Sequence, residues 1–514
     1  MTTIEFFNSH FFNYMNQLLQ NSFKISGLTI LIMITVFSVA TAQSEIKDVS
    51  KKTMNLEQAI QISLANNTQM KRSLLSIKNA DQDIRKAWSN VMPSVTASAN
   101  YTRNLEVPVN FIPAIIFNPN ANSGDLVPVA FGTDNSWQGG LSVSQTIFSG
   151  QAFVGISSSE LYKEAQSESM RATSQGIVTK TRIAYYQALV SKEQLRLVQT
   201  QIDRIKQNLE DTKIRYEQGF TDEYAVLQLE VQLGNLEPQL IQAEFQVKKA
   251  LQELLDVMGL PVQLSIDIKG DLGAFNVRTM SAENEVNIEL KKVDRLTTLT
   301  LEEDSIALNN AMNFRGDLRM LDIQKELLGK QLDAEKSTYL PTISASYNLN
   351  WSASQPGKPV FFGTDDSRAR SQTLMLNVQV PIFQGFKRDA AVQQAQIQVK
   401  DNEVQLFQAA QTASKEILSA KQDVSEALQT NEALKKAIDQ AEIGYERATI
   451  RYQNGLGSQQ EVTDADLQLR QAEVNYTQMV ARYLTAKAQY DLAVGKVPFI
   501  EEDIQEIKKN IELK

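Results

Sequence analysis

Between Leu195 and Val257, apolar and small residues recur in alternating steps of three and four. This spacing puts them on one stripe of a helix, which is typical of the seam of a left-handed coiled coil. A break at Gly219 predicts that the helix folds back on itself there. The positions are Leu195, Val198, Ile202, Ile205, Leu209, Thr212 and Tyr216, then Val226, Leu229, Leu233, Leu236, Leu240, Ala243, Val247, Ala250, Leu254 and Val257.

The same pattern occurs a second time, 236 residues later. The turn is repeated as well, because Ile214-Arg215-Tyr216 before Gly219 matches Ile450-Arg451-Tyr452 before Gly455. A repeat of this length indicates an internal duplication. The second stripe consists of Leu434, Ile438, Ala441, Tyr445, Ala448 and Tyr452, then Val462, Ala465, Leu469, Ala472 and Tyr476.

In each repeat the pattern changes from helical to alternating directly after a proline, Pro93 or Pro341. Alternation of apolar and polar residues predicts strands with one apolar and one polar face. The apolar positions are Val95, Ala97, Ala99 and Tyr101, with Trp137, Gly139, Leu141 and Val143 in the return strand of the first repeat. In the second repeat they are Ile343, Ala345, Tyr347, Leu349 and Trp351, with Leu374, Leu376, Val378 and Val380.

These patterns predict the organisation of the whole chain. Residues 43–259 form a first repeat, with a β-hairpin at 94–148 and a long helical hairpin at 150–258 in which Pro238 predicts a bend. Residues 260–300 form an inter-repeat, equatorial segment. Residues 301–495 form a second repeat, with a β-hairpin at 342–383 and a helical hairpin at 384–494, and 496–514 is a charged tail.

The amino-terminal segment predicts export. Lys24 precedes an apolar run from Ile25 to Val39, and the small-x-small residues Ala40 to Ala42 follow it. This order predicts a signal peptide over 1–42, cleaved after Ala42. A membrane anchor is the alternative, although the run is short for a span. The stretch before Lys24 is unusual for a signal, so Met15 is a second candidate for the true start.

Composition narrows the classes of function. The chain has no Cys, its single His is His10 in the expected signal peptide, and its formal net charge is −9. Without His or Cys the mature chain lacks the commonest bases, nucleophiles and metal ligands. We therefore expect no enzymatic activity, metal or cofactor, and a hydrolase using carboxylates alone is the remaining enzymatic alternative. The negative charge argues against a nucleic-acid partner.

The predicted strands are long enough to cross a bilayer when tilted. Four strands per chain cannot close a barrel, since about eight is the practical minimum. If they enter a membrane, several chains share one barrel, and the long helices prolong it into a tube. The alternative is a small soluble sheet beside a coiled-coil rod. In the membrane interpretation, the lipid-facing side chains are Tyr101, Leu141, Val143, Tyr347, Leu349, Trp351, Leu374, Leu376 and Val378.

The loop of the first β-hairpin is 13 residues longer than that of the second. It contains the apolar stretch Val107 to Phe117, which is unusual for an external loop. We expect this stretch to pack against the rim of its own barrel. Contact with lipid, another protomer or a surface partner remains open.

The duplicated order of helix, proline, strand, loop, strand and long helical hairpin resembles the TolC-like outer membrane efflux protein family. The elements that carry the likeness are the helix–strand junctions at Pro93, Pro341, Gly150 and Gly385, the motif Phe-x-Gly that ends at Gly150 and again at Gly385, the segment Phe314-Arg315-Gly316-Asp317-Leu318, and the hairpin turns at Gly219 and Gly455. The likeness covers essentially the whole mature chain.

The resemblance implies a mainly α-helical protein with membrane β-strands, an internal duplication and a homotrimeric assembly. Three chains would build one twelve-stranded transmembrane barrel and a periplasmic tunnel of coiled-coil hairpins. It also implies a location in the outer membrane of a diderm bacterium, extending into the periplasm. The implied partners are a periplasmic adaptor (membrane fusion) protein, an inner-membrane transporter and outer membrane lipid.

A conduit of this kind needs a gate, and the helical turns are the place for one. Glu461 and Asp464 follow Gly455 on one helical face, and symmetry would repeat them as a ring of carboxylates. The equivalent residues of the first repeat are Ala225 and Gln228, so only one hairpin carries the acids. Solvated surface acids are the alternative.

The family resemblance adds Tyr452 as a member of the closing network, although its repeat partner Tyr216 also suggests a seam residue. Gly457 stands where the family often has a basic residue, which puts a salt-bridge lock by that residue in doubt. The expected function is a passive exit duct of a tripartite efflux or type I secretion system, carrying drugs or secreted protein and gated at the helical tip. The alternative is a non-conducting coiled-coil protein of the envelope or cell surface.

Overall fold

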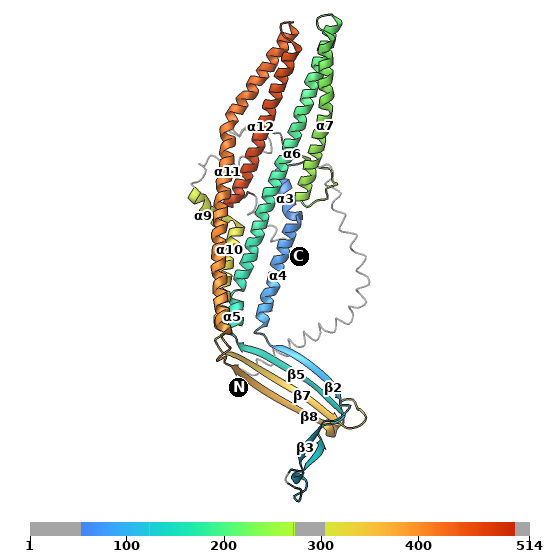
Figure 1. Ribbon diagram of the computed structural model, residues 1–514, viewed down its shortest axis with the longest axis vertical. Coiled ribbons are helices and arrows are strands. Elements are labelled where there is room, and N and C mark those ends of the chain that lie inside the picture. The colour runs from blue at the N-terminus through green and yellow to red at the C-terminus, as the bar shows by residue number, and fades with distance from the viewer. Residues whose placement is uncertain (1–52, 123, 271, 273–303, 499–514) are drawn as a thin grey trace, which may run out of the picture.

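The computed structural model describes residues 53–122, 124–270, 272 and 304–498. It is an elongated molecule, with long helices at one end, a four-stranded sheet beyond them and a small β-hairpin at the opposite end (Figure 1). The expected signal peptide, most of the inter-repeat segment and the tail from 499 onward lie outside the described residues.

The first repeat contains two short helices, one junction helix and one long helical hairpin. Asn55 caps the first helix, accepting a hydrogen bond from the Gln58 amide, and Asn67 separates it from the next helix. Asn is a favoured N-cap because its side chain satisfies an otherwise unpaired amide. The bounds are α3 Leu56–Asn66, α4 Thr68–Ser89, α5 Gly150–Ser157, α6 Ser159–Glu217 and α7 Glu223–Val257. Helix α7 continues through Pro238 without interruption.

The second repeat follows the same order. Its helices are α9 Asp304–Phe314, α10 Gly316–Ser337, α11 Lys387–Gln453 and α12 Gln459–Val494. The 67 residues of α11 give it a length of about 100 Å at 1.5 Å per residue. None of the described helices is both long and apolar enough to pass through a bilayer.

The alternating segments are strands, as their patterns predict. Strands β2 Ser94–Arg103, β5 Asn135–Phe148, β7 Thr342–Gln355 and β8 Arg368–Gln379 form one antiparallel sheet in the order β2-β5-β7-β8. The central pairing, β5 with β7, joins the two repeats. Strands β2 and β8 are the edges, and neither has a second neighbour among the described residues.

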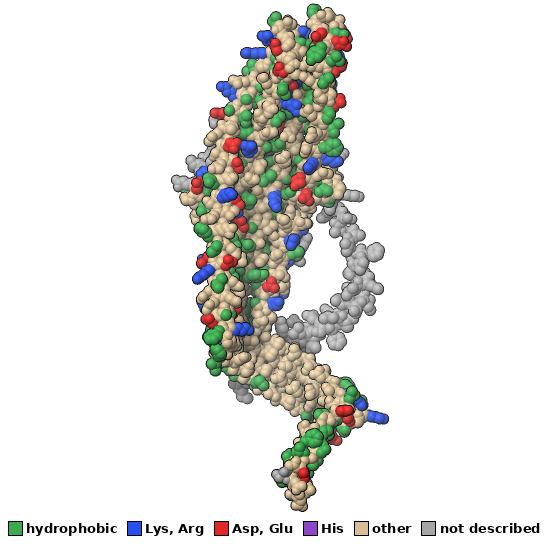
Figure 2. Space-filling model, in the orientation of Figure 1, with side chains coloured by type: hydrophobic (Ala, Val, Ile, Leu, Met, Phe, Trp, Pro, Cys, Tyr) green, Lys and Arg blue, Asp and Glu red, His purple; other side chains and the backbone are tan. Residues whose placement is uncertain are grey.

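The register of the sheet separates apolar from polar residues. Val95, Val143, Tyr347 and Leu374 are paired across the four strands, so their side chains share one face. All nine expected lipid-facing residues lie on that same face. The opposite face carries mainly Ser, Thr, Asn and Gln, including Ser142, whose Oγ donates to Asn348 Oδ1 at 2.7 Å. Figure 2 shows almost no charged side chains over the sheet.

The longer loop forms a hairpin of its own, with strands β3 Val109–Pro113 and β4 Leu126–Ala130 and the short helix η4 Ala114–Ile116. It extends beyond the end of the sheet and presents many apolar side chains (Figures 1 and 2). Phe111 is 67% exposed and Phe117 62%. In the single chain β3 pairs with β4 and leads away from the sheet, and packing of this stretch on the rim of a barrel formed by several chains stays a prediction.

The main core lies midway along the rod, where α3, α6, the end of α7 and the end of α12 meet. Ile60, Tyr185, Leu254 and Tyr483 are fully buried there. Strands β1 Thr53–Met54 and β6 Asp267–Ile268 pair beside this core. A core at this level joins both repeats into one unit, from which the two hairpins extend together.

Candidate functional site

The two helical turns at the end of the rod have the same backbone. Gly219 and Gly455 adopt φ of +78° and +73°, a region that favours glycine. In each turn the residue after the glycine donates its amide to the carbonyl five residues earlier, Phe220 to Arg215 and Leu456 to Arg451. This is the Schellman arrangement, which satisfies the last carbonyls of a helix. The expected hairpin turns are therefore built identically.

Tyr452 lies at the contact between the two hairpins. Its side chain is 8% exposed, and its hydroxyl lies 3.0 Å from Thr212 Oγ1 of α6. Tyr216, the equivalent residue of the first repeat, is 45% exposed. The two tyrosines therefore have different environments, although they occupy equivalent positions in the apolar stripes of the two repeats.

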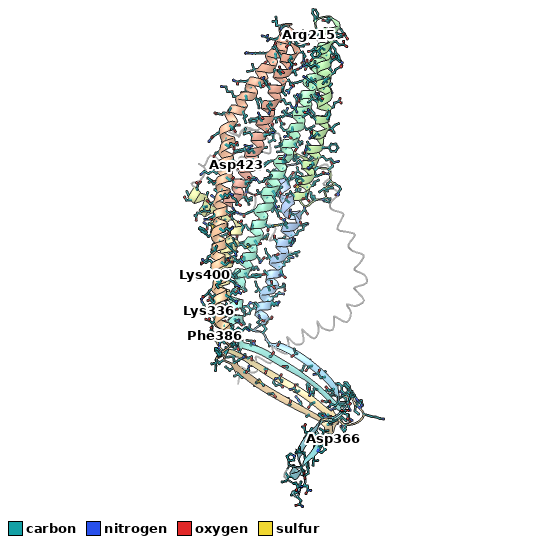
Figure 3. The ribbon with its side chains drawn as sticks, viewed as in Figure 1. Arg215, Lys336, Asp366, Phe386, Lys400 and Asp423 are labelled. Atoms are coloured by element: carbon teal, nitrogen blue, oxygen red, sulfur yellow. The ribbon has the colours of Figure 1, made fainter. Side chains whose placement is uncertain are left out.

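Arg215 reaches from the first tip to the second (Figure 3). It donates from Nη1 to the carbonyl of Tyr452 at 3.0 Å and from Nη2 to the carbonyl of Gln453. Its guanidinium also lies over the Tyr452 ring, 5.1 Å from the ring centroid. A cation at the C-terminal end of α11 is favourable because carbonyl groups and the negative end of the helix dipole converge there. The sequence pattern placed Arg215 in the turn motif but did not predict its contact with the other hairpin.

Arg451, the repeat partner of Arg215, stays within its own turn. It donates from Nη2 to the Leu456 carbonyl at 3.0 Å, and its Nε lies 3.7 Å from Glu461 Oε2. Both side chains of this ion pair are at least half exposed, so the pair contributes little to stability. Gly457 leaves room for it, because a Cβ there would lie 2.9 Å from Glu461 Oε2.

Asp464 lies one turn after Glu461 on α12 and is exposed in the single chain. Gln460 donates to Asp464 Oδ1 at 2.8 Å and accepts from Gln228 of α7 at 2.6 Å. The acidic segment of the second hairpin is therefore connected to the first hairpin through Gln460. Between the tips is a cleft of about 720 Å³, lined by residues that include Arg215, Phe220 and Asn454.

A group of charged side chains farther from the tips was not identified from the sequence. Arg204 of α6 lies between two carboxylates of α12, with its Nε 2.8 Å from Asp466 Oδ1 and its Nη2 3.7 Å from Glu473 Oε2. Burial raises the pKa of Asp466, against the opposing effect of Arg204. Burial likewise raises the pKa of Glu473, and Arg204 again opposes the shift.

The helix–strand junctions use glycine and proline for different reasons. Pro93 and Pro341 each stand directly before a strand. Gly150 begins α5 where a Cβ would lie 2.6 Å from Ser337 Cβ of α10, so a larger residue would push the helices apart. Gly385 has a φ of +57° and precedes Phe386, which is also left-handed and exposed at the base of α11 (Figure 3).

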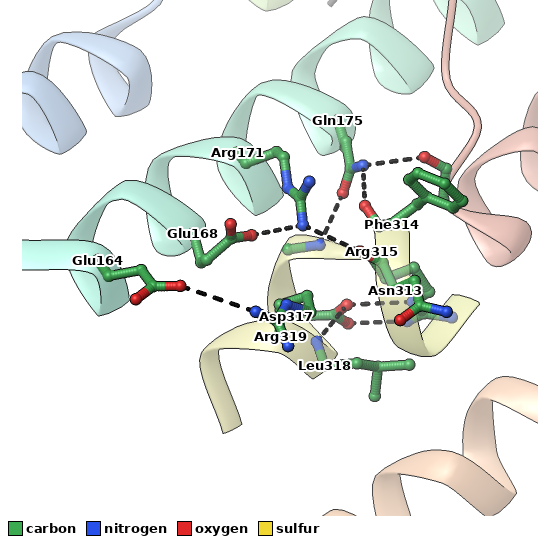
Figure 4. Close-up of polar contacts among 12 residues, drawn as sticks. Glu164, Glu168, Arg171, Gln175, Asn313, Phe314, Arg315, Asp317, Leu318 and Arg319 are labelled. Carbon is green, nitrogen blue, oxygen red and sulfur yellow. Dashed lines mark hydrogen bonds and ion pairs between the residues drawn. The ribbon is translucent and has the colours of Figure 1, made fainter. Parts of the chain in front are cut away.

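The Phe-Arg-Gly-Asp-Leu segment joins the second repeat to the first (Figure 4). Gln175 of α6 accepts from the Gly316 amide and donates to the Phe314 and Gly495 carbonyls. Arg315 holds Asp317 at 2.8 Å, and although burial opposes the shift, Arg315 lowers the pKa of Asp317. A Cβ on Gly316 would lie 2.4 Å from the Ala172 amide nitrogen, which explains the glycine.

Comparison with known proteins identifies the family of this chain. The family model described as outer membrane efflux protein matches residues 59–260 and 307–496, one segment in each repeat. The chain belongs to the outer membrane efflux protein family. The outer membrane protein TolC of Salmonella enteritidis is 21% identical over 446 residues, which cover 86% of this chain and 82% of that relative. TolC of Escherichia coli (strain K12) is 21% identical over 448 residues, with the same coverage.

Solved outer-membrane channels share the fold. The CmeC channel of Campylobacter jejuni superposes with a TM-score of 0.64 at 16% identity, covering 88% of each chain. The open state of the MtrE channel of Neisseria gonorrhoeae has a TM-score of 0.64 at 15% identity, covering 86% of this chain and 89% of that one.

As a member of this efflux family, the protein is an outer-membrane exit duct that extends into the periplasm. The family is one of channels rather than enzymes. Within the described residues, no group of three or more His, Asp or Glu side chains is arranged to hold a metal ion.

Proposed function

We propose that three copies of this chain form one outer-membrane channel that is closed at the helical tips. The observation that carries the proposal is the four-stranded sheet with two free edges, β2 and β8. In lipid, an unpaired strand edge leaves each backbone amide and carbonyl unsatisfied at several kcal/mol, so the edges need partners. Pairing β8 of one copy with β2 of the next closes a twelve-stranded barrel after three copies.

The two faces of the sheet assign the inside and the outside of this barrel. The apolar face, which carries residues such as Leu141, Leu349 and Leu374, faces lipid. The face with Ser142, Asn348 and their neighbours lines the bore, where water satisfies their polar groups. The long helices continue the barrel as a periplasmic tunnel, to which an adaptor protein and an inner-membrane transporter dock.

Pairing between copies can be tested cleanly because the chain contains no Cys. Ser98→Cys in β2 is combined in turn with Thr373→Cys, Met375→Cys and Asn377→Cys in β8, all on the polar face. Oxidation in the membrane is expected to give a covalent trimer for at least one pair, because each copy then contributes both edges. Single-Cys variants are the controls. Covalent dimers that never progress to trimers would contradict a ring of three.

The proposed closure at the tips uses two sets of residues. Arg215, Thr212 and Tyr452 hold the hairpins of one chain together, as the contacts above support. Symmetry repeats Glu461 and Asp464 around the narrow end as a carboxylate ring, which attracts and retains cations. Gly457 stands where the family often has a basic residue. In this chain Arg215 of the first hairpin provides the positive charge at the second tip instead.

The carboxylate ring predicts a specific response to cations. Glu461→Ala combined with Asp464→Ala is expected to raise single-channel conductance in planar bilayers and to reduce block by divalent and trivalent cations, since the charged ring is removed. Unchanged block would remove these two residues from the constriction. A purified protein that forms no channels would instead favour the structural coiled-coil alternative.

A further inference from the structure

Arg204 lies where all four long helices approach one another. It belongs to α6, its carboxylate partners Asp466 and Glu473 belong to α12, and its guanidinium lies 5.6 Å from the centroid of the Tyr445 ring on α11. On α12, Arg470 donates to Gln239 of α7 at 2.7 Å. Polar side chains therefore connect both hairpins at this level, on the tip side of the main core.

The charges in this group are largely removed from water. The side chain of Arg204 is 16% exposed, that of Asp466 7% and that of Glu473 20%. Gln201 adds a hydrogen bond, donating from Nε2 to Asp466 Oδ2 at 3.2 Å. Removing one partner from a buried ion pair is strongly destabilising, because the other charge is left without compensation. One guanidinium balancing two carboxylates makes Arg204 the most sensitive member of the group.

Only the arginine of this group lacks a counterpart in the other repeat, since Glu230 and Glu237 are equivalent to Asp466 and Glu473. The residue equivalent to Arg204 is Gln440 of α11, so the duplication supplies the arginine once. Its partners belong to the hairpin that also carries Glu461 and Asp464. We propose that Arg204 is a positioning residue that compensates the buried charges of Asp466 and Glu473, which lets the second hairpin pack against the first and keeps the tips closed. This inference rests on the closure proposed above.

The charges around the group determine its response to pH. Asp466 is faced by Arg204, Gln201 and Arg470, and Glu473 by Arg204, Arg196 and Asp466. Arg196 is itself paired with Glu193 at 2.7 Å. Burial raises the pKa of both carboxyls despite these cations. A cleft of about 200 Å³ beside Asp466, lined by residues of α6, α7 and α12, gives the group a route to solvent.

The sign of the pH effect follows from linkage. A carboxyl whose pKa is higher in the packed state binds its proton more tightly there than when the hairpins separate and the group is hydrated. Lowering the pH therefore favours the packed state, and raising it through the elevated pKa weakens packing. Without Arg204 the two carboxylates face each other across the interface uncompensated, and only protonation removes their charge. The Arg204→Met variant is therefore expected to leak at neutral pH and to close again in acid.

The test uses the full-length channel in planar bilayers at about pH 7.5 and about pH 5, because the raised pKa values of the two carboxyls favour their protonation as the pH falls. Arg204→Met is expected to raise open probability about tenfold or more at the higher pH, with recovery at the lower pH. Arg204→Lys keeps the charge and is expected to lie near wild type. Tyr452→Phe, which keeps this group and the tip acids, controls for general loosening and is expected to leak without comparable recovery in acid.

A charge-free variant covers failure of Arg204→Met to assemble. Arg204→Met with Asp466→Asn and Glu473→Gln removes all three charges, so it is expected to assemble and to show wild-type open probability at both pH values. Wild-type behaviour of Arg204→Met at neutral pH, an equal leak at both pH values, or a leak in the charge-free variant would overturn the proposal. Absence of conductance in the wild-type protein would instead count against the proposed channel.

Discussion

The two helical tips have the same backbone but different side-chain contacts. Both turns end in a left-handed glycine with the same pair of backbone hydrogen bonds. Yet Arg215 crosses to the carbonyls of the second tip, whereas Arg451 bonds to Leu456 in its own turn. Tyr452 is buried against Thr212, while Tyr216 is exposed. The two hairpins therefore share a backbone, but the contacts between their tips use the side chains of Thr212 and Arg215 from the first and Tyr452 from the second.

This asymmetry agrees with the placement of the acids. Glu461 and Asp464 occur on the second hairpin, and the equivalent residues of the first hairpin, Ala225 and Gln228, carry no charge. A ring of like charges repels itself when it narrows. In the closure that we propose, the second hairpin needs attachment to the first, and Arg215 provides it at the tip.

Removing the contacts of Arg215 with the second tip should have the largest effect on open probability. Arg215→Ala removes hydrogen bonds from a charged group, which are each worth about 1.5–3 kcal/mol, so open probability is expected to rise about tenfold or more. Arg451→Ala removes contacts of exposed groups within one turn and is expected to change it less than about twofold. Single-channel recording of both variants makes the comparison. Equal effects of the two substitutions would mean that the tips are not functionally distinct.

The tyrosines test the same asymmetry at a smaller scale. Tyr452→Phe removes the hydroxyl that bonds Thr212, a loss of about 1 kcal/mol or about fivefold in open probability. Tyr216→Phe is the matched control and is expected to match wild type, because Tyr216 is 45% exposed. A leak from Tyr216→Phe of similar size would show that the stripe, rather than the cross-hairpin bond, controls closure.

Moving the acids to the other hairpin tests which tip lines the constriction. Gln228→Asp places a carboxylate at the position of α7 equivalent to Asp464, whereas Ala225, equivalent to Glu461, is buried and is left unchanged. Cation block is expected to stay within about twofold of wild type, because a charge away from the narrowest ring is screened by salt. Block that increases as much as it falls in the Glu461 and Asp464 variants would show that both hairpins contribute to the ring.

The turn glycines should show the smallest difference between the tips. Gly219→Ala and Gly455→Ala each place a Cβ on a residue with positive φ, at a cost of about 1 kcal/mol. Because neither site has an atom within 4 Å of the added Cβ, the loss of thermal stability should be nearly the same for both. Scanning calorimetry of the two variants measures it. A clear inequality would reveal a difference in the turns that the backbone does not show.

The fold was predictable because its signals are periodic. Alternation around Leu141 and Leu349 predicted the strands and the shared apolar face, and the repeat predicted both turns. For the stretch near Phe111, composition shows that it is apolar but does not predict that β3 and β4 pair with each other.

The site was less predictable because its contacts are long-range and break the repeat. Arg215 and Arg451 are equivalent in sequence, and only the packing of α6 beside α11 and α12 distinguishes them. Asp466 stands two residues after Asp464 and looks equally solvated. It is buried because α6 covers it, and no local pattern reports that contact.

Tethering the tips tests the central claim most directly. Gln228 and Gln460 bond across the two hairpins at 2.6 Å, and the chain has no competing Cys. Gln228→Cys with Gln460→Cys, introduced into the Arg215→Ala variant and joined by a short reducible thiol crosslinker, should lower conductance to the wild-type level. Reduction of the linker should restore the leak. Conductance that stays high while the tether is intact would contradict closure by contact between the two hairpins.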